Sequence, residues 1–528
     1  MRYPPAASVA RKGVIAALVL LAPGLGAGVA RAATVVVVTG HGWGHGVGMS
    51  QWGARGYALH GWDWHRILAH YYPGTGVSTT ANVNVHVLLA ASQPGADVAC
   101  AAGMRVGDAT GRTYPLPAGS YHLGPGLRVR KLRLQSPVAF YCSAAPIEWD
   151  GRAYHGVLVV SSGSGRLAIV NSVDLEDYVR GVIADEMPHR WPLAALEAQA
   201  VAVRSYALTT IRPGRRFDLY ADDRSQVYGG MGAETASTLF AATRTEGQIL
   251  TYDGRVASTY FFSTSGGRTA DVRDVWPQLG DVPYLRSVPD PYDTASPVHS
   301  WTLAFSAQRL AARLGVPFGA LRLLRNGSDR VTEVDVGGVP LAGQRVMRLL
   351  HLRSTWFSIG ELSLAGGQTS VPYGRRVALA AGAHDAGEAM LQQLTSAGWK
   401  TLRRIRGGAR AWVAPRGYTI YRLTAGDVRG PEVGVAVSPV VRVRLESRTL
   451  LSGQVLPRPG GEVTVSRFVA GGWRIVARPR LDSRGVFHTP VRLRPGGYRI
   501  DVAGGVRLAP ATRTLRVTSR LLASLHHS

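Results

Sequence analysis

Apolar and polar positions alternate along much of the chain, and the period of this alternation separates strand-rich from helical regions. Residues 82–170 alternate in short runs such as NVNVHVLLA, LRVRKLRL and GVLVVSSG, broken by Gly, Pro and Ser. This period of two predicts a strand-rich region. A second strand-rich region is expected at 248–268.

Helical spacing appears in four other places. The run WHRILAHYY (64–72) is followed by Pro73-Gly74, which predicts one short helix. Asp174 is placed to cap a helix that runs to about residue 185, and Pro192 opens another one. An amphipathic helix is predicted at 306–314. The helix after Pro192 has an apolar stripe at helical spacing, made of Leu196, Ala200, Val203 and Ala207.

The pattern changes near residue 360, where GELSLAGGQTSVPYG predicts a linker at 361–372. The chain beyond it contains two similar units, because SAGWKTLRRI and RGYTIYRLTAG are echoed by AGGWRIVARP and GGYRIDVAGG 74 to 80 residues later. Alternating strands at this period fit two small β-sandwiches, at 373–445 and 446–528. The sequence therefore predicts an α+β core at 79–360 and two all-β, immunoglobulin-like modules.

A separate block at 33–78 contains GHGWGHGVGMSQWGARGYA (40–58), whose glycines are too dense for a helix or a strand. His41 and His45 have the i, i+4 spacing of paired metal ligands on a helix, but the glycines argue against a helix there, and no metal is predicted. A tight turn that satisfies its own polar groups is the purely structural alternative.

The first 32 residues have the features of a secretory signal peptide. Basic residues precede the apolar run Val14 to Leu21, and Ala30-Arg31-Ala32 is an A-x-A cleavage site. A retained membrane anchor is the alternative, but it needs about 20 apolar residues. We expect a secreted protein, extracellular or associated with the cell wall.

The formal net charge is +26, but the basic residues are scattered and almost all are arginine. No basic stripe with interleaved aromatics is present, and export argues against a nucleic-acid partner. A polyanionic cell envelope is the more plausible partner for such a charge. The two cysteines, Cys100 and Cys142, are expected to form one disulfide in an oxidising compartment.

Glu186 is the candidate for acid chemistry. Pro188 breaks the helix that contains it, and Trp191 is nearby. A carboxyl at the negative end of a helix, partly desolvated by aromatic rings, is expected to have a raised pKa and to hold a proton at neutral pH. A general acid for glycoside cleavage needs this property. A solvated glutamate at a helix end, without a chemical role, is the alternative.

The segment NSVDLEDYVRGVIADEMPHRWPLAALEAQAVAVRSYAL (171–208) resembles the SpoIID/LytB family, which includes peptidoglycan lytic transglycosylases and amidase enhancers. Further family-like blocks cover most of 80–358. The resemblance implies that Glu186, in E-M-P, is the catalytic acid. The matching blocks are QVYGG (226–230), TEGQILTYDG (245–254), YFFSTSGGRTADVRDVW (260–276), PYLRSVPDPY (283–292) and LRSTWF (352–357).

The Gly-rich block at 40–58 also resembles the family, but most members have it after the LRSTWF-like text. The core is therefore expected to be circularly permuted, which is tolerated where chain ends lie close together. The loop should then return to the Glu186 cleft. There His45, Ser50 and Gln51 would supply hydrogen bonds to a sugar chain, and Trp43 or Trp52 a stacking face.

Other polar residues in family-like text are candidates for substrate binding. Arg204 has a structural salt bridge as an equally good alternative, and the serines lack the His and Asp partners of a nucleophile. Some family members have a zinc site just before the Q-V-Y block, but Tyr220, Arg224 and Ser225 occupy those positions here, so no cofactor is expected. The candidates are Arg204, Tyr206, Gln226, Ser263 and Ser265.

Two functions follow from the resemblance. The first is a lytic transglycosylase that cleaves the bond between N-acetylmuramic acid and N-acetylglucosamine and leaves 1,6-anhydro ends. The second is a non-catalytic wall-binding factor that stimulates a cell-wall amidase. Glycan strands of peptidoglycan are the expected partner in both. One well-placed glutamate without an obvious second carboxylate favours the transglycosylase over a hydrolase.

Overall fold

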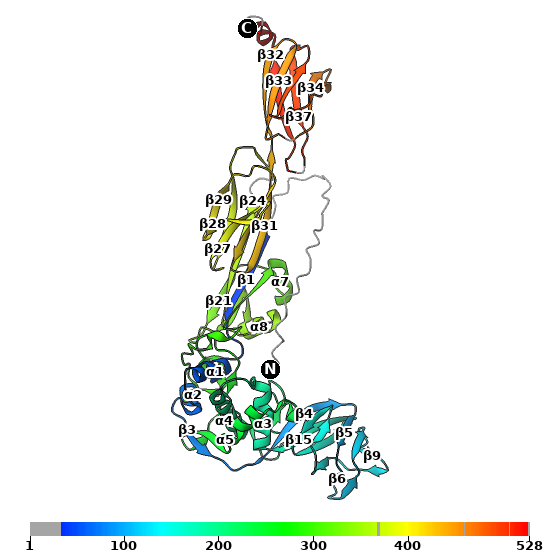
Figure 1. Ribbon diagram of the computed structural model, residues 1–528, viewed down its shortest axis with the longest axis vertical. Coiled ribbons are helices and arrows are strands. Elements are labelled where there is room, and N and C mark those ends of the chain that lie inside the picture. The colour runs from blue at the N-terminus through cyan, green and yellow to red at the C-terminus, as the bar shows by residue number, and fades with distance from the viewer. Residues whose placement is uncertain (1–32, 367–369, 459, 506, 526–528) are drawn as a thin grey trace.

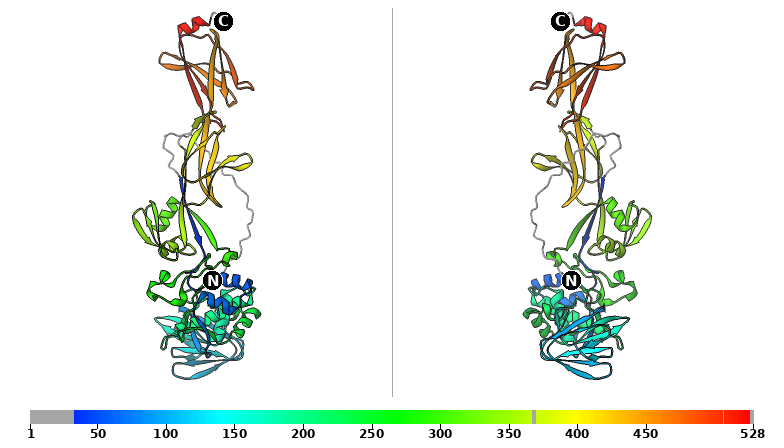
Figure 2. Two further views of the ribbon diagram at one scale, coloured as in Figure 1. Left: turned by 90° about the vertical axis from the view of Figure 1, so that its left-hand side faces the viewer. Right: turned by 90° about the vertical axis from the view of Figure 1, so that its right-hand side faces the viewer.

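The computed structural model describes residues 33–366, 370–458, 460–505 and 507–525. The predicted signal peptide lies outside these residues. The described chain is elongated, with a mixed body of helices and sheets at one end and two β-sandwiches in line beyond it (Figures 1 and 2). This confirms the predicted α+β class and the all-β modules. Among the described residues, no helix is long and apolar enough to cross a membrane.

The strand-rich region predicted at 82–170 forms two larger sheets and a two-stranded one, made of β9 (Arg128–Val129) and β10 (Leu132–Arg133). A disulfide joins Cys100 to Cys142, the pair expected from the sequence. The larger sheet has the order β16 (Leu219–Tyr220), β4 (Asn84–Gln93), β15 (Arg166–Asp174), β14 (Val157–Gly163), β11 (Val138–Cys142), β6 (Met104–Asp108) and β7 (Thr113–Leu116). The smaller sheet has the order β13 (Arg152–Tyr154), β12 (Ile147–Trp149), β5 (Ala96–Cys100) and β8 (Gly119–Leu123).

Helices pack beside these sheets, and the predicted ones are confirmed. Asp174 caps α3 by accepting a hydrogen bond from the amide of Asp177, and Pro192 precedes α4. The predicted stripe of α4 is fully buried, but so are most of its other residues, because the other helices of the body surround it. The helices are α1 (Gln51–Leu59), α2 (Trp64–Tyr71), α3 (Leu175–Glu186), α4 (Leu193–Thr210) and α5 (Ala236–Arg244).

A smaller unit with its own hydrophobic core lies between the body and the sandwiches. Ser306 caps the predicted amphipathic helix α7, whose apolar face includes Leu310 and Leu314. The unit contains β20 (Ser300–Ser306), α7 (Ala307–Leu314), β21 (Leu321–Arg325), β22 (Val331–Val336), β23 (Val339–Ala342) and α8 (Gly343–Leu350).

The strand β1 (Ala33–His41) joins three parts of the molecule. It pairs with β20 on one side and with β24 (Phe357–Gly366) on the other. Because successive side chains of a strand point to opposite faces, Val36 and Val38 enter the core of the small unit, while Val37 enters the core of the first sandwich. One short strand thus fixes the first sandwich to the unit below it.

Strand β24 also corrects the predicted linker. Residues 361–366 form the second half of β24 and 370–372 form β25 (Ser370–Pro372), so most of the stretch at 361–372 is strand. Gly360, Ser363 and Gly366, which suggested a linker, lie in a strand whose alternate residues, such as Leu362 and Leu364, are buried. The first sandwich therefore begins at β24, earlier than residue 373.

The two sandwiches have the same topology, which explains the sequence repeat. The first, module 1, packs β24-β26-β29 against β31-β30-β27-β28, with β25 added beside β31. The second, module 2, packs β32-β33-β36 against β38-β37-β34-β35. Three strands facing four, with the same chain order, is an immunoglobulin-like arrangement. Module 2 begins at Val440, before the predicted boundary at 446.

Their strands complete the description of the fold. Module 1 contains β24, β25, β26 (Val377–His384), β27 (Ala389–Thr395), β28 (Gly398–Ile405), β29 (Gly407–Val413), β30 (Thr419–Ala425) and β31 (Val428–Ser438). Module 2 contains β32 (Val440–Ser447), β33 (Leu450–Leu456), β34 (Val463–Val469), β35 (Gly472–Ala477), β36 (Val486–Pro490), β37 (Gly496–Val502), β38 (Ala511–Val517) and α9 (Ser519–Ser524).

The pairing of β1 with β24 has the geometry that a permuted chain requires. The strands are antiparallel, with Ala33 opposite Leu364 and Gly40 opposite Phe357. The start of β1 therefore lies beside the end of β24, where a hairpin turn could join them. Such a turn would place the Gly-rich block after the LRSTWF text. In this chain β24 continues into module 1 instead.

Candidate functional site

Glu186 is the last residue of α3. The helix stops there because Met187 has an extended backbone and Pro188 follows it. The side chain of Glu186 is only 6% exposed, and it is enclosed on one side by the segment that precedes Tyr228. It is therefore not the solvated helix terminus that the sequence left open as an alternative.

The Gly-rich segment folds as a loop followed by a helix. Its glycines Gly42, Gly44, Gly46 and Gly48 all have positive φ, which other residues rarely adopt. The prediction that 40–58 is too glycine-rich for a helix was wrong for its second half, which is α1. Gly53 and Gly56 are tolerated in α1 because side chains of Tyr71, Asp290 and Tyr292 occupy the space that a Cβ would need.

The same loop is hydrogen-bonded to the LRSTWF text. The amide of Gly44 donates to the carbonyl of Arg353 (3.1 Å), and the amide of His41 donates to the carbonyl of Trp356 (2.9 Å). The hydroxyl of Ser354 donates to the carbonyl of His41 (2.6 Å). The two blocks that stand at opposite ends of the core sequence are thus neighbours in space.

Two N–H groups bind the carboxyl of Glu186. The side-chain amide of Gln51 donates to Oε2 (3.0 Å), and the backbone amide of Val227 donates to Oε1 (2.9 Å). The first contact crosses 135 residues of sequence and comes from the first residue of α1. The Gly-rich segment therefore lies against the helix break at Glu186, as the sequence predicted.

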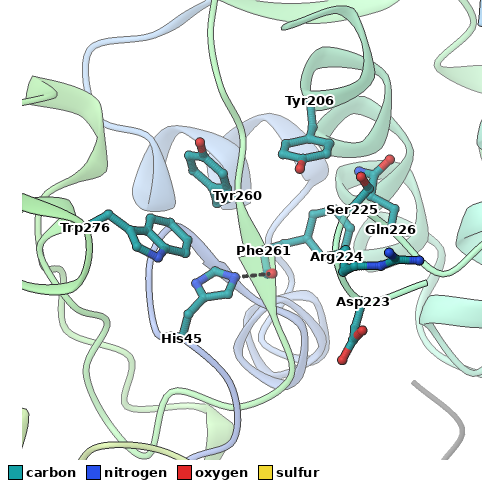
Figure 3. Close-up of a pocket in the computed structure, with 9 residues that line it drawn as sticks. All are labelled: His45, Tyr206, Asp223, Arg224, Ser225, Gln226, Tyr260, Phe261 and Trp276. Atoms are coloured by element: carbon teal, nitrogen blue, oxygen red, sulfur yellow. Dashed lines mark hydrogen bonds between the residues drawn. The ribbon is translucent and has the colours of Figure 1, made fainter. Parts of the chain in front are cut away.

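A pocket of about 120 Å³, drawn in Figure 3, is lined in part by the segment before Val227, and Glu186 is not among its lining residues. Gln226 forms part of its wall and is adjacent in sequence to Val227, which binds Glu186. The hydroxyl of Tyr178 donates to Oε1 of Gln226 (2.8 Å), while Nε2 of Gln226 is buried and has no hydrogen-bond partner among the described residues. The lining residues are His45, Tyr206, Asp223, Arg224, Ser225, Gln226, Tyr260, Phe261 and Trp276.

His45 faces the pocket between aromatic rings, 4.8 Å from the ring of Trp276. Its Nδ1 accepts a hydrogen bond from the amide of Val47 (3.1 Å), which places the proton of the neutral ring on Nε2. Nε2 then donates to the carbonyl of Phe261 (3.1 Å). Burial, reinforced by the charge of Arg330, lowers the pKa of His45 to about 4.

This arrangement changes the predicted role of His45. Both ring nitrogens bind the protein, so neither is free to bind a sugar or a metal ion. His41 points elsewhere, with its ring 4.9 Å from that of Trp356. His45 lines the pocket as a neutral, rigid wall rather than as a hydrogen-bonding group.

An aromatic pair lies where α1 meets the turn between α3 and α4. Trp52 and Trp191 contact each other edge to face, with ring centroids 4.9 Å apart. The guanidinium of Arg55 lies 5.3 Å from one ring and 5.8 Å from the other. Of the two tryptophans considered for stacking, Trp52 is therefore the one beside the helix break. Trp43 instead forms a β-bridge with Thr264 and lies under Arg353.

Several predicted substrate-binding residues have structural roles instead. Arg204 is fully buried and makes a two-pronged ion pair with Glu176 (2.6 and 2.8 Å), the alternative that the sequence left open. Ser50 caps α1 by accepting from the amide of Gly53. Ser265 donates to Asp293 (2.9 Å), and Ser263 is buried beside Thr264. Sequence position alone did not reveal these contacts.

Sequence reasoning missed three parts of the site. The backbone amide of Val227 carries no side-chain signal. Tyr260 and Trp276 line the pocket and lie at the two ends of YFFSTSGGRTADVRDVW, a family-like block in which neither residue was expected to have a role. In the region of the possible zinc site, Asp222 is bound by Arg224 through both carboxylate oxygens (2.8 and 2.7 Å).

Comparisons with known proteins show which proteins this chain resembles. Residues 163–252 match the family model SpoIID, described as stage II sporulation protein. The chain is 32% identical over 211 residues to stage II sporulation protein D of Bacillus amyloliquefaciens, covering 36% of this chain and 60% of that protein. It is 37% identical over 136 residues to the amidase enhancer of Bacillus subtilis (strain 168), covering 25% of this chain and 17% of that protein.

These matches are partial. The chain spans 50% to 61% of the length of three curated relatives that it matches. Among solved structures, a two-domain fibronectin type-III segment from chicken tenascin matches with a TM-score of 0.21 and 12% identity, covering 29% of this chain and 97% of that chain. That similarity is too low to support an argument.

Proposed function

We propose that the core of this chain belongs to the SpoIID/LytB family and that the protein is a peptidoglycan lytic transglycosylase, on the basis of its partial matches to that family. The family acts at the bacterial cell wall. The substrate would be the glycan strand, and the protein would act outside the cell or within the wall. The contact between Gln51 and Glu186 supports this most directly, because it brings a second family block onto the one glutamate at a helix break.

Glu186 would act as the acid and then as the base. It protonates the oxygen between N-acetylmuramic acid and N-acetylglucosamine, and the bond from C1 of the muramic residue to that oxygen breaks. The C6 hydroxyl of the same residue then bonds to C1 and returns its proton to Glu186. The product is a 1,6-anhydro end, no water is consumed, and a second carboxylate is not needed.

The hydrogen bonds to Glu186 suit this role. The amides of Gln51 and Val227 fix the plane of the carboxyl group, and each oxygen keeps a second lone pair. One oxygen can therefore carry a proton while both contacts persist. The pocket next to the Val227 segment is walled partly by aromatic rings, which suit the faces of a sugar.

One observation favours the alternative, a wall-binding factor that stimulates an amidase without catalysis of its own. Glu186 is only 6% exposed and both of its oxygens already have protein partners. In that case Glu186 would hold α1 in place, and the pocket would only bind glycan.

The deciding experiment uses protein from Ala33 onward and purified peptidoglycan, with and without stem peptides. We expect soluble fragments with anhydro-muramyl ends, identified by mass. Glu186→Gln keeps the shape and removes the proton donor, so the rate should fall by about 10²- to 10⁴-fold. Glycan binding should survive, and the exposed Glu246→Gln serves as control.

Other outcomes would reject the proposal. Reducing ends would indicate a hydrolase. No release by wild type, with glycan binding present, would support the wall-binding factor, which would then be tested by adding a cell-wall amidase. Equal activity of Glu186→Gln and wild type would remove Glu186 from the mechanism.

A further inference from the structure

The positive charge of the chain is concentrated in its C-terminal modules. Residues 370–528 contain 26 Arg and Lys against 8 Asp and Glu, whereas residues 33–369 contain 30 against 26. Residues 370–528 therefore carry a net charge of +18 and residues 33–369 only +4. Within the described part of the modules, three ion pairs are present, Arg404–Glu388, Arg480–Glu462 and Arg499–Asp501. Most of these arginines have no acidic partner in the described chain.

A pocket of about 790 Å³ lies at the junction of the two modules. Its walls come from the ends of β27 and β30 in module 1 and from two loops of module 2. Three arginines line it, Arg416, Arg458 and Arg507, and all three are exposed. None of its lining residues is acidic, and none of the three arginines is in an ion pair within the described chain.

The two modules are held together at this junction. The amide of Tyr418 in module 1 donates to the carbonyl of Arg507 in module 2 (2.7 Å). The amide of Ala509 donates to the carbonyl of Val437 (2.9 Å), and Leu508 packs against the core of module 1. One residue, Pro439, separates β31 from β32. Arginines from both modules therefore line one pocket at a hydrogen-bonded boundary.

Tyr418 adds an aromatic surface to the pocket. Its side chain is 52% exposed, and its ring lies over Gly434, where a Cβ would collide with it. The absence of a side chain at Gly434 lets the ring lie flat on the sheet. Aromatic rings held in this way pack against the apolar faces of sugars and polyols, while guanidinium groups bind phosphate through paired hydrogen bonds.

We propose that this junction pocket binds an anionic polymer of phosphodiester-linked polyols. Arg416, Arg458 and Arg507 bind successive phosphate groups, and Tyr418 packs against the polyol between them. At physiological salt an exposed charge acts over about 8 Å, so the arginines of the pocket contribute far more than those elsewhere on the modules. This binding is independent of the chemistry at Glu186 and would keep the body close to a surface that carries such a polymer.

The test measures binding of the whole protein, from Ala33 onward, to purified poly(glycerol phosphate) at several salt concentrations. The triple variant Arg416→Gln/Arg458→Gln/Arg507→Gln is expected to bind roughly tenfold more weakly or worse. The slope of log K against the logarithm of the salt concentration should also become shallower by about 2, because three phosphate contacts are lost. Cleavage of peptidoglycan fragments too short to reach the modules should not change.

A charge-matched control separates a pocket from diffuse attraction. Arg474, Arg516 and Arg520 are exposed and have no ion pair in the described chain. The strand register puts the first two near Tyr498 and Gly497, at the end of module 2 away from the junction. Arg474→Gln/Arg516→Gln/Arg520→Gln removes the same charge, so it should weaken binding by less than about threefold.

Each remaining outcome overturns the proposal. Equal losses in the two triple variants would mean that net charge alone attracts the polymer. Equal affinity for polygalacturonate would mean that the pocket does not select phosphate. Tighter binding of single-stranded DNA through the same three arginines would make it a nucleic-acid site. No binding by wild type at physiological salt would remove the site altogether.

Discussion

Replacing Asp290 by asparagine is expected to stabilise the region around α1 at neutral pH and to have little effect at pH 4. Asp290 is completely buried, and neither of its carboxylate oxygens has a hydrogen-bond partner of good geometry. Hydroxyls of Tyr71, Ser50 and Ser265 lie beside it and partly compensate. Burial, reinforced by the negative charge of Asp293, raises the pKa of Asp290 from 3.8 to about 6.

The magnitude follows from that pKa. A group whose pKa is higher in the folded state than in the unfolded state binds its proton more tightly when folded. Folding is therefore favoured while Asp290 is protonated, and this advantage disappears as the pH rises from 3.8 through 6. The difference corresponds to about 3 kcal/mol above pH 7, because each pKa unit is worth 1.36 kcal/mol. Asparagine has nearly the same shape and never ionises, so it avoids this cost.

Hydrogen exchange is the suitable assay, because a chain with several cores does not unfold in one step. Peptides covering α1 and α2 report the opening that exposes Asp290. At pH 7.5 their protection in Asp290→Asn should exceed that of wild type by up to about 150-fold, and at pH 4 the two proteins should match. The exposed Asp427→Asn is the control. Reduced protection at both pH values, or an equal gain at both, would refute the reasoning.

Two further predictions concern the site itself. Gln51→Ala removes one hydrogen bond that positions Glu186, so kcat should fall by about tenfold or more while KM changes little. The exposed Gln308→Ala is the control. A rise in KM alone, or the same loss of kcat in the control, would contradict a positioning role. His45 should stay neutral throughout pH 5–8, because burial lowers its pKa to about 4. Its stabilising contribution is lost as the pH falls from 6.5 towards 4, and an NMR titration midpoint near 6.5 would contradict this environment.

Local signals in the sequence were sufficient for the helices α2, α3, α4 and α7 and for the repeat. Asp174 and Ser306 each cap the helix that was predicted to follow them, because a short polar side chain directly before an amphipathic run can accept a hydrogen bond from the first turn. The repeated tryptophan and tyrosine segments fall on equivalent strands of the two modules, β28 and β35, β30 and β37. Glu186 was found because a proline two positions later ends its helix.

Tertiary packing decided what the sequence did not. The helix α1 forms despite Gly53 and Gly56, because both glycines face side chains that leave no space for a larger residue. Strand β24 was mistaken for a linker because its partner β1 lies more than 300 positions earlier in the chain. The alternatives for Arg204 were equal in the sequence because its partner Glu176 is 28 positions away on another helix.

The position of β1 also sets the order in which the chain can complete its fold. Ala33 pairs with Leu364, which the ribosome adds 331 residues later. Strand β1 therefore cannot pair with β24 until almost all of the body has been synthesised. The loop that follows β1 must wait as well, because Arg353 and Trp356 hold it. Closing so long a stretch of chain is slow, and the contact between Gln51 and Glu186 forms only after it. The contact between Gln51 and Glu186 is therefore completed only after the chain has been made as far as Leu364.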